Sequence, residues 1–245
     1  GAGSGVGQGI IKSLRLSSLN LKIIACDINY YNAGLYRADE KLIIPKLEHL
    51  INPKKMIDII KEKNIDIVFI GSEFDLIYFS KNKKVIEDNS NCLVIASPIE
   101  SIKIADDKYL TAKFLKENNI VSSKFWAPKN IDHASEIFKN YGKPIILKAR
   151  SGTSNRNVHF IKDINELLNL YPITPNPMMQ EILSEPSDVL NNEYTCSIFK
   201  TKSGKILGPF TSRRTLRSGN SWVIEVKEFK ELFPLLLKIG KIFPI

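Results

Sequence analysis

Two apolar runs with a polar segment between them lie near the middle of the chain. The first run follows Pro144 and ends at Ala149, with Lys148 as its one cation, and the second covers residues 158–161. The residues between them, 151–157, are polar and include a glycine, so the pattern predicts a hairpin of two strands joined by a flexible loop. A lysine at the end of a strand, facing a loop rich in backbone N–H groups and hydroxyls, suits the binding of a polyphosphate. A surface hairpin with a solvated lysine is the alternative.

The first hundred residues alternate between strand-like and helix-like patterns, which predicts a parallel, doubly wound sheet. A glycine-rich turn over residues 1–9 runs directly into a segment with helical apolar spacing. Because such a turn normally follows a strand, we expect residues before Gly1 to form the first strand of the sheet. The apolar runs at 21–26, 65–70 and 91–96 predict further strands, and residues 53–63 predict a helix.

The later part of the chain predicts a mixture of helices and shorter strands. Helical patterns cover residues 108–120, 134–141 and 228–241, and strand patterns cover 178–183, 192–199 and 206–210. This arrangement indicates an α+β region after the parallel sheet.

Composition narrows the range of functions. The 245 residues are 43% hydrophobic, which is enough for one large domain or two to three small ones, and no apolar stretch approaches the ~20 residues of a membrane span. The net charge of +9 would allow a nucleic-acid partner, but the lysines are scattered rather than clustered. A small ligand that carries phosphate would use the same positive charge. We therefore expect a cytoplasmic protein with neither a nucleic-acid partner nor a membrane anchor.

The cysteines and histidines do not have the spacing of a metal site. Cys26, Cys92 and Cys196 stand alone among apolar residues, so we expect three buried thiols in a reducing compartment. His49, His133 and His159 are isolated as well, and we expect no metal ligands among the residues at hand.

One interpretation of the glycine-rich turn is a dinucleotide site. Gly1, Gly5 and Gly7 match the pattern G-x-x-x-G-x-G, Asp27 follows at the distance of a ribose-binding carboxylate, and Tyr109 and Lys113 form a Y-x-x-x-K pair. These features resemble the short-chain dehydrogenases, which would make the protein an NAD(P) oxidoreductase. Against this, Tyr109 comes too early in the chain, and residues separated by four positions on a helix match by chance often.

The order of motifs across the chain resembles the ATP-grasp superfamily, in particular its carbamoyl-phosphate-synthase-like and biotin-carboxylase-like members. The pair Asp107-Lys108 opens a helix, and the segment Lys148-Ala-Arg150 is followed by Gly152-Thr-Ser-Asn-Arg-Asn-Val158, similar to the family's K-P-R and G-S-G-S-R-G-V. The resemblance implies a pre-ATP-grasp Rossmann-like domain over residues 1–97. It further implies a first ATP-grasp lobe over residues 98–177 and an incomplete second lobe over residues 178–245.

The same resemblance assigns candidate site residues. Lys108, Lys148, Arg150 and Thr153 would contact the phosphates of ATP, and Gln180, Glu181, Ile182 and Leu183 would adjoin the adenine. Glu193 would approach the ribose or the phosphates, while Arg213 and Arg214 would act at the site of an acyl phosphate.

The implied activity is that of an ATP-dependent carboxylate–amine or carboxylate–thiol ligase that works through an acyl-phosphate intermediate. Its partners would be small-molecule carboxylate and amine substrates. The oligomeric state is left open between a monomer and a homodimer. ATP and Mg²⁺ would be required, and the resemblance places the Mg²⁺ ligands beyond Ile245. A nucleotide-binding relative without catalysis is the other alternative.

Overall fold

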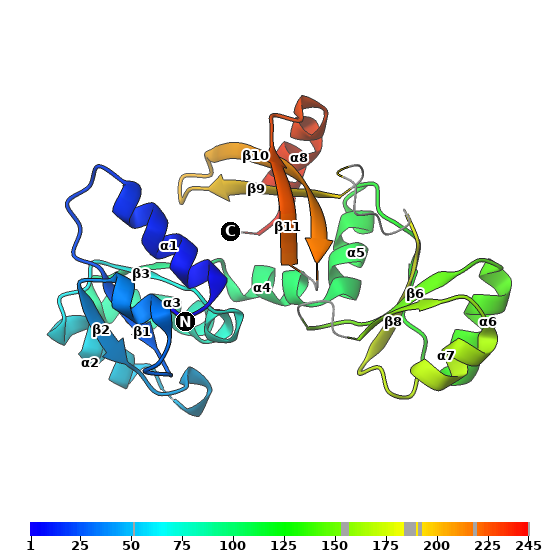
Figure 1. The fold of residues 1–245 in the computed structure, drawn as a ribbon, viewed down its shortest axis with the longest axis horizontal. Helices are drawn as coiled ribbons and strands as arrows, with labels where there is room; N and C mark the ends of the chain where they lie inside the picture. The colour runs from blue at the N-terminus through cyan, green and yellow to red at the C-terminus, as the bar shows by residue number, and fades with distance from the viewer. Residues whose placement is uncertain (51, 153–156, 184–189, 191–192, 218–219, 245) are drawn as a thin grey trace. The chain divides into compact units, whose positions relative to one another are not determined.

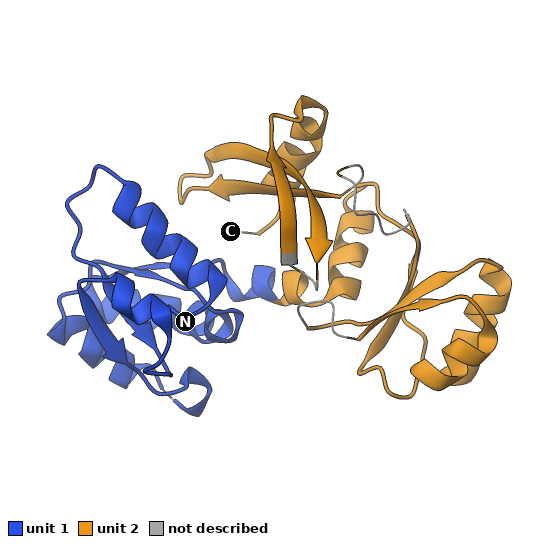
Figure 2. Ribbon diagram, viewed as in Figure 1, with its two compact units in different colours: residues 1–102 blue, residues 103–245 orange. Residues whose placement is uncertain are grey.

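The computed structural model describes residues 1–50, 52–152, 157–183, 190, 193–217 and 220–244 (Figure 1). The chain divides into two compact units, residues 1–102 and residues 103–245 (Figure 2). Each unit is described separately below.

The first unit contains parallel strand pairs flanked by helices. Strand β1 (Ile24–Asp27) pairs in parallel with β2 (Glu40–Ile43), and β3 (Ile67–Phe69) pairs in parallel with β4 (Leu93–Ile95). The helices are α1 (Gly5–Leu16), α2 (Lys54–Glu62) and α3 (Glu73–Ser90), with short 3₁₀ turns η1 (Ala33–Arg37) and η2 (Leu47–His49). The parallel α/β character expected for this part of the chain is confirmed.

Two apolar clusters hold the first unit together. Helices α2 and α3 bury Ile60 and Ile86 beside Val94 of β4, while α1 buries Ile11 beside Ala25 of β1. Helix α3 was not evident from the sequence, because its buried residues Tyr78, Phe79, Ser80 and Ile86 do not follow a regular helical stripe.

Helix α5 (Lys108–Glu117) follows α4 (Ile99–Asp106) and is held at both ends. At its beginning the Lys108 N–H donates to the Arg150 carbonyl at 2.9 Å. Towards its end the Phe114 ring lies 4.9 Å from that of Phe243, and Lys238 Nζ donates to the Asn119 carbonyl at 2.8 Å. The helix therefore contacts the residue that follows β6 at its beginning and the segment that follows α8 in its second half.

The first sheet of the second unit has the strand order β5-β8-β6-β7 and is antiparallel throughout. Its strands are β5 (Phe125–Trp126), β6 (Ile145–Ala149), β7 (Val158–Ile161) and β8 (Pro177–Glu181). Helices α6 (Ile131–Tyr141) and α7 (Ile164–Leu170) cover one face. Strand β6 buries Ile145, Leu147 and Ala149, so the strand alternation places Lys148 on the other face. The hairpin expected from the sequence is confirmed as β6 and β7.

The second sheet has the order β11-β10-β9 and is also antiparallel. Its strands are β9 (Tyr194–Lys200), β10 (Ile206–Arg217) and β11 (Asn220–Val226), followed by η3 (Lys230–Leu232) and α8 (Phe233–Ile242). Helix α8 packs on β9 and β10, and Gly240 lies against Ile198. The strand expected at residues 206–210 extends to Arg217, so both candidate arginines lie within it.

The strands that the structure describes form sheets of two, three, two and four strands. A short-chain dehydrogenase requires one continuous sheet, so its fold is not observed. Among the described residues no helix is long and apolar enough to cross a membrane. The expectation of three buried thiols was wrong in part, because Cys92 is buried but Cys26 and Cys196 are half-buried.

Candidate functional site

Lys148 lies on the open face of the four-stranded sheet. It pairs across the sheet with Met178 of β8 and Val158 of β7. Its ammonium donates a hydrogen bond to Gln180 Oε1, and Gln180 Nε2 donates to Ser123 Oγ. The three side chains thus form a chain of hydrogen bonds that orients the lysine. Ser123 was not singled out in the sequence, since an isolated serine before a short strand carries no signal.

Within the described part of the chain, no carboxylate is paired with Lys148. Burial lowers the pKa of Lys148, and the positive charge of Lys108 lowers it further. Lys108 Nζ donates to the carbonyls of Arg150 at 3.3 Å and Gly152 at 2.9 Å. Among the described residues neither ammonium is paired with an acidic side chain. Two partly desolvated cations close to each other form a favourable position for an anion.

Arg150 has a partner within the chain. Its guanidinium binds Asp107, with Nε 3.0 Å from both carboxylate oxygens, and lies 4.9 Å from the centre of the Tyr109 ring. Burial raises the pKa of Asp107, but the hydrogen bonds from Arg150 and from the first turn of α5 outweigh it, so the net pKa is lowered. Arg150 therefore joins the end of β6 to the beginning of α5, and its contact with a nucleotide stays a prediction.

The residues expected beside adenine lie at the end of β8. The Glu181 carboxylate accepts hydrogen bonds from the Lys124 N–H at 2.7 Å and from the Tyr141 hydroxyl at 3.4 Å. It therefore lies on the helix-covered side of the sheet, opposite Lys148. Ile182 is half-buried and Leu183 is 75% exposed, which leaves their side chains without a defined role. Their contacts with adenine stay a prediction.

The two arginines of β10 point to opposite faces of the three-stranded sheet, as neighbours along a strand do. Arg213 binds the Glu225 carboxylate of β11, with Nη2 at 2.7 Å, whereas Arg214 binds Glu193, with Nε at 3.0 Å. Arg214 also donates to Ser221 Oγ at 3.1 Å. The structure thus brings Glu193 and Arg214 together and separates Arg213 from them. Glu225 was missed because β11 was not predicted.

Two further predictions, on Thr153 and on the ligands of Mg²⁺, concern residues that the structure does not describe. Thr153 lies outside the described residues. Within the described ranges no group of three or more His, Cys, Asp or Glu side chains could hold a metal ion. The Mg²⁺ ligands thus stay a prediction for residues beyond Ile245.

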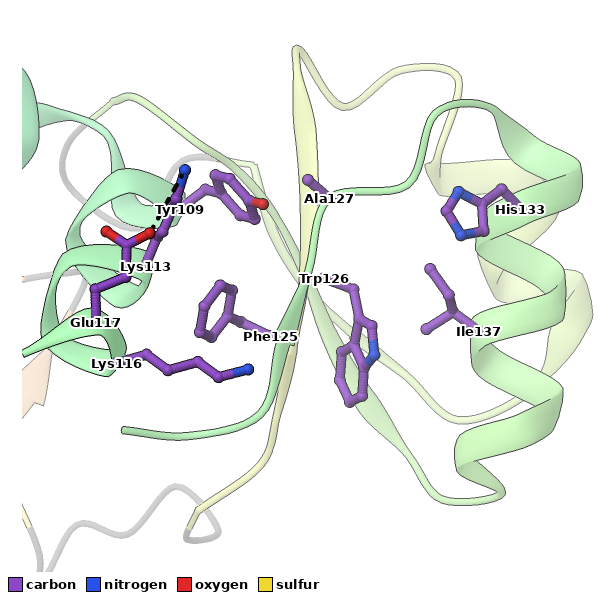
Figure 3. Close-up of a pocket in the computed structure, with 9 residues that line it drawn as sticks. All are labelled: Tyr109, Lys113, Lys116, Glu117, Phe125, Trp126, Ala127, His133 and Ile137. Atoms are coloured by element: carbon purple, nitrogen blue, oxygen red, sulfur yellow. Dashed lines mark ion pairs between the residues drawn. The ribbon is translucent and has the colours of Figure 1, made fainter. Parts of the chain in front are cut away.

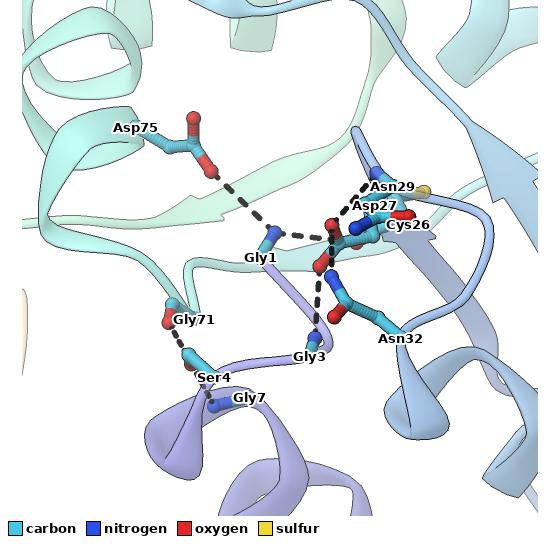
Figure 4. A network of polar contacts seen from close by, with 10 residues as sticks. All are labelled: Gly1, Gly3, Ser4, Gly7, Cys26, Asp27, Asn29, Asn32, Gly71 and Asp75. Atoms are coloured by element: carbon cyan, nitrogen blue, oxygen red, sulfur yellow. Dashed lines mark hydrogen bonds and ion pairs between the residues drawn. The ribbon is translucent and has the colours of Figure 1, made fainter.

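The glycine-rich turn of the first unit is organised around Asp27 (Figure 4). This carboxylate is 4% exposed and accepts hydrogen bonds from Gly3 N at 2.8 Å, Asn29 N at 3.0 Å and Asn32 Nδ2 at 2.6 Å. Burial raises the pKa of Asp27, but these hydrogen bonds lower it below its usual range. Because both carboxylate oxygens are occupied by the chain itself, Asp27 fixes the turn rather than presenting a free acceptor to a ribose.

The glycines of this turn allow close packing. A Cβ atom on Gly7 would lie 2.3 Å from the Gly1 carbonyl oxygen, and one on Gly71 would lie 2.7 Å from Gly7 Cα. Ser4 caps α1 by accepting from the Gly7 N–H at 2.9 Å and donates to the Gly71 carbonyl. Gly5 and Gly9 face open space.

These features define a class of fold. A parallel α/β unit is followed by two antiparallel sheets, and Lys148 of the first sheet lies near Lys108 of α5, neither with an acidic partner among the described residues. The chain has the ATP-grasp fold of the biotin-carboxylase type, and the resemblance expected from its motifs is confirmed.

Comparison with known proteins supports this assignment. Residues 4–95 match the family model described as PylC-like, N-terminal domain. The chain is 24% identical to "Uncharacterized protein MG011" of Mycoplasma genitalium over 234 residues, which is 93% of this chain and 77% of that protein.

Two solved structures cover nearly the whole chain. The biotin carboxylase domain of 2-oxoglutarate carboxylase from Hydrogenobacter thermophilus, in complex with MgADP, ADP and bicarbonate, matches 96% of this chain with a TM-score of 0.71 and 17% identity. N5-carboxyaminoimidazole synthetase from Staphylococcus aureus, complexed with ADP, matches 98% with a TM-score of 0.71 and 14% identity. The chain spans 55% and 60% of the lengths of these two proteins.

Proposed function

We propose that the chain forms the nucleotide-binding part of an ATP-dependent ligase that activates a carboxylate. The observation that carries the proposal is the pair formed by Lys148 of β6 and Lys108 at the beginning of α5. Burial and the nearby positive charge of Lys108 both lower the pKa of Lys148, and neither lysine has an acidic partner among the described residues. A polyphosphate between them would offset both the burial and the repulsion.

The similar folds support the same interpretation. The names of both solved relatives include ADP, and one also includes magnesium and bicarbonate. For this chain, ATP with Mg²⁺ is the proposed cofactor. The described residues supply ammonium donors suited to phosphate oxygens, but they supply no cluster suited to a metal ion, so we derive no step from the metal.

The chemistry we propose is carboxylate activation, as in carbamoyl-phosphate-synthase-like enzymes. A carboxylate oxygen attacks the γ-phosphorus of ATP, and ADP leaves with the electron pair of the broken P–O bond. An amine or thiol then attacks the acyl carbon, and inorganic phosphate leaves. Lys108 and Lys148 would neutralise phosphate charge, and the remaining work is positioning.

The residues of the second sheet would act on the far side of the nucleotide. Glu193 would accept hydrogen bonds from the ribose, and Arg214 would hold it in position through their ion pair. Arg213 and Arg214 are each now paired with a glutamate, so each would release that carboxylate when it neutralises the acyl phosphate. For Arg214 this step would follow the binding of the ribose, because it ends the ion pair that holds Glu193. We further propose that the substrates are small molecules and that the protein is cytoplasmic. A monomer and a homodimer are both compatible with the proposal.

Calorimetric titration with ATP and Mg²⁺ tests nucleotide binding. Lys148→Met keeps most of the side-chain volume and removes the charge, so the affinity should fall about tenfold to a hundredfold, since a charge-assisted contact contributes roughly 1.5–3 kcal/mol. The matched control is Lys162→Met, an exposed lysine just after β7, which should leave affinity unchanged. Equal affinities for wild type and Lys148→Met would contradict the proposal.

Two measurements separate the alternatives. Reduced nicotinamide cofactors should give no saturable fluorescence change, whereas low-micromolar binding would favour an oxidoreductase. Formation of an acyl phosphate can be trapped with hydroxylamine in the presence of bicarbonate or an amino-acid carboxylate. Nucleotide binding without trapped product under any of these conditions would indicate a relative that binds but does not catalyse.

A further inference from the structure

A groove lies along the free edge of strand β5 and is not used by the proposed nucleotide site. Two adjoining pockets of about 580 and 430 Å³ share the residues Lys116, Phe125 and Trp126. The groove is built from α5, β5 and α6, all in the second unit, whereas the two candidate phosphate-binding lysines lie outside its lining.

Strand β5 has an unpaired edge. It stands at the end of the order β5-β8-β6-β7 and pairs with β8 alone among the described strands. An edge strand leaves alternate backbone N–H and C=O groups without strand partners, so it can accept a further strand. The residues that lead into β5 lie open as well, with Val121 95% exposed.

Helices border this edge on both sides (Figure 3). Phe125 points towards α5, where its ring lies 5.5 Å from the Tyr109 ring, and Trp126 points towards Ile137 of α6. An extended chain laid along β5 would therefore contact an aromatic side chain on each face. Alternate side chains of a strand point to opposite faces, so such a chain could fill both pockets.

The charge of the groove is basic. Three lysines, Lys113, Lys116 and Lys124, line the two pockets, against one acidic residue, Glu117, which lies 3.7 Å from Lys113. Lysines at a sheet edge discourage pairing with neutral or basic strands. The same charges favour an acidic strand, because opposite charges steer and select partners at interfaces.

From these observations we infer that the β5 edge binds an extended acidic peptide segment of a partner protein, which adds a strand to the four-stranded sheet. Backbone hydrogen bonds to β5 would provide the pairing, Phe125 and Trp126 would contact apolar side chains, and the lysines would select acidic ones. Phe125 lies on the same face of the sheet as Lys148, but neither Lys148 nor Lys108 lines the groove.

Tryptophan fluorescence of the full chain tests the inference. The chain has two tryptophans, so Trp222→Phe leaves Trp126 in the groove as the sole reporter. The probe is a short peptide, blocked at both ends, in which pairs of valines alternate with pairs of glutamates, so that each face of the added strand carries both kinds of side chain. We expect a saturable change in Trp126 emission that weakens as salt is raised. A peptide with lysine in place of glutamate should give no saturable change.

Two further probes distinguish strand pairing from simple attraction of charge. A peptide with the same glutamates but with proline in place of the valines lacks the backbone N–H group at every proline, so it pairs incompletely along β5 and should bind at least about tenfold more weakly. Blocked diglutamate, which is too short to pair along β5, should not bind saturably. Equal binding of the proline peptide, or saturable binding of diglutamate, would show a general anion site and overturn the inference.

Charge variants locate the binding. Lys113→Glu with Lys116→Glu should weaken the acidic peptide at least about tenfold. The control pair, Lys202→Glu with Lys205→Glu, makes the same charge change in the exposed turn between β9 and β10 and should leave affinity within about twofold. Loss of binding in the control pair, or retention in the groove pair, would overturn the inference.

Hydrogen exchange provides an independent readout that does not depend on a variant. The acidic peptide should slow exchange of amides in residues 123–127 of the wild-type chain, because a new strand would protect the free edge. Unchanged exchange there at saturating peptide would contradict strand addition. Self-association of the peptide-free chain that is abolished by Lys113→Glu with Lys116→Glu would instead assign the edge to a second copy and overturn the inference.

Discussion

The carboxylate of Asp107 binds the guanidinium of Arg150 while it caps helix α5. Its Oδ1 atom accepts from Arg150 Nε at 3.0 Å and from the Tyr109 and Leu110 N–H groups at 2.9 and 3.1 Å. Both side chains are largely buried, at 22% exposed for Arg150 and 15% for Asp107. Asp107 thus accepts hydrogen bonds from the N–H groups of the first turn of α5 and, at the same time, from the guanidinium of Arg150, which follows β6.

Asp107→Ala should destabilise the chain more than the loss of a helix cap alone. Removing the cap costs about 1 kcal/mol, and leaving the Arg150 charge unpaired adds about 1–2 kcal/mol. The matched control is Asp163, which caps α7 and has no arginine partner among the described residues, so Asp163→Ala should cost about 1 kcal/mol. Urea unfolding of the three proteins measures the difference, and equal losses would show that the ion pair adds nothing.

The stability provided by Asp107 should depend on pH in the acid range. Its pKa is lower in the folded chain than the usual value of about 3.9, so its contribution is complete above that value and is lost as the pH falls below it. The free-energy gap between wild type and Asp107→Ala should therefore be constant from neutral pH to about pH 5 and shrink below about pH 4. A gap that stays constant to lower pH would contradict the assignment.

Lys148→Met should change the free energy of unfolding of the ligand-free chain by less than about 1 kcal/mol at neutral pH. The variant loses the hydrogen bond to Gln180, but it also removes a partly buried charge and its repulsion by Lys108, and these effects offset each other. Since the folded pKa lies below the unfolded value of about 10.4, wild type should gain stability relative to the variant as pH rises towards that value. Chemical unfolding across this alkaline range makes the comparison. A difference that is independent of pH would show that the lysine is solvated.

Alanine substitutions at two glycines of α1 should have opposite effects. Gly7→Ala would force its Cβ within 2.3 Å of the Gly1 carbonyl oxygen, so we expect a loss of about 1–3 kcal/mol. Gly9 faces open space on the same helix, and Gly9→Ala should stabilise the chain by about 0.5–1 kcal/mol. Thermal unfolding of both variants tests the packing role of the turn, which fails if Gly7→Ala is as stable as wild type.

Cys92 should resist alkylation in the folded chain. Burial raises its pKa from 9.0 to about 11, and the thiol is 2% exposed. At pH 8 the thiolate fraction is thus about a hundredfold lower than for an ordinary thiol of the same starting value. Iodoacetamide labelling followed by peptide mass analysis should modify Cys92 only after denaturation, and rapid labelling of the native chain at Cys92 would contradict its burial.

Much of the fold could be predicted from local patterns. Two apolar runs separated by a polar loop predicted the hairpin of β6 and β7, because buried strands joined by a turn leave that pattern locally. The resemblance to a family motif placed the start of a helix at Asp107-Lys108, and the structure shows Asp107 capping α5 there. Helix α6 begins at Ile131 rather than Ala134, because Asn130 caps it by accepting from the His133 N–H.

The remaining features depend on contacts between distant segments. The pairing of Arg150 with Asp107 spans 43 positions, and that of Arg213 with Glu225 requires the register of β10 and β11. Neither can be inferred from residue type, so the sequence marked these arginines as ligand-binding without revealing their partners. An extended segment around Trp126 could be expected from the sequence, but edge strand β5 is two residues long, and so short a run has no periodicity from which its pairing with β8 follows.

Helix α5 is held at both ends by contacts with other elements of the second unit. Asp107 and Lys108 fix its beginning to Arg150 at the end of β6, and Phe114 fixes its second half to Phe243 after α8. A change in the position of one sheet relative to the other would therefore have to break or rearrange the contacts at one end of α5.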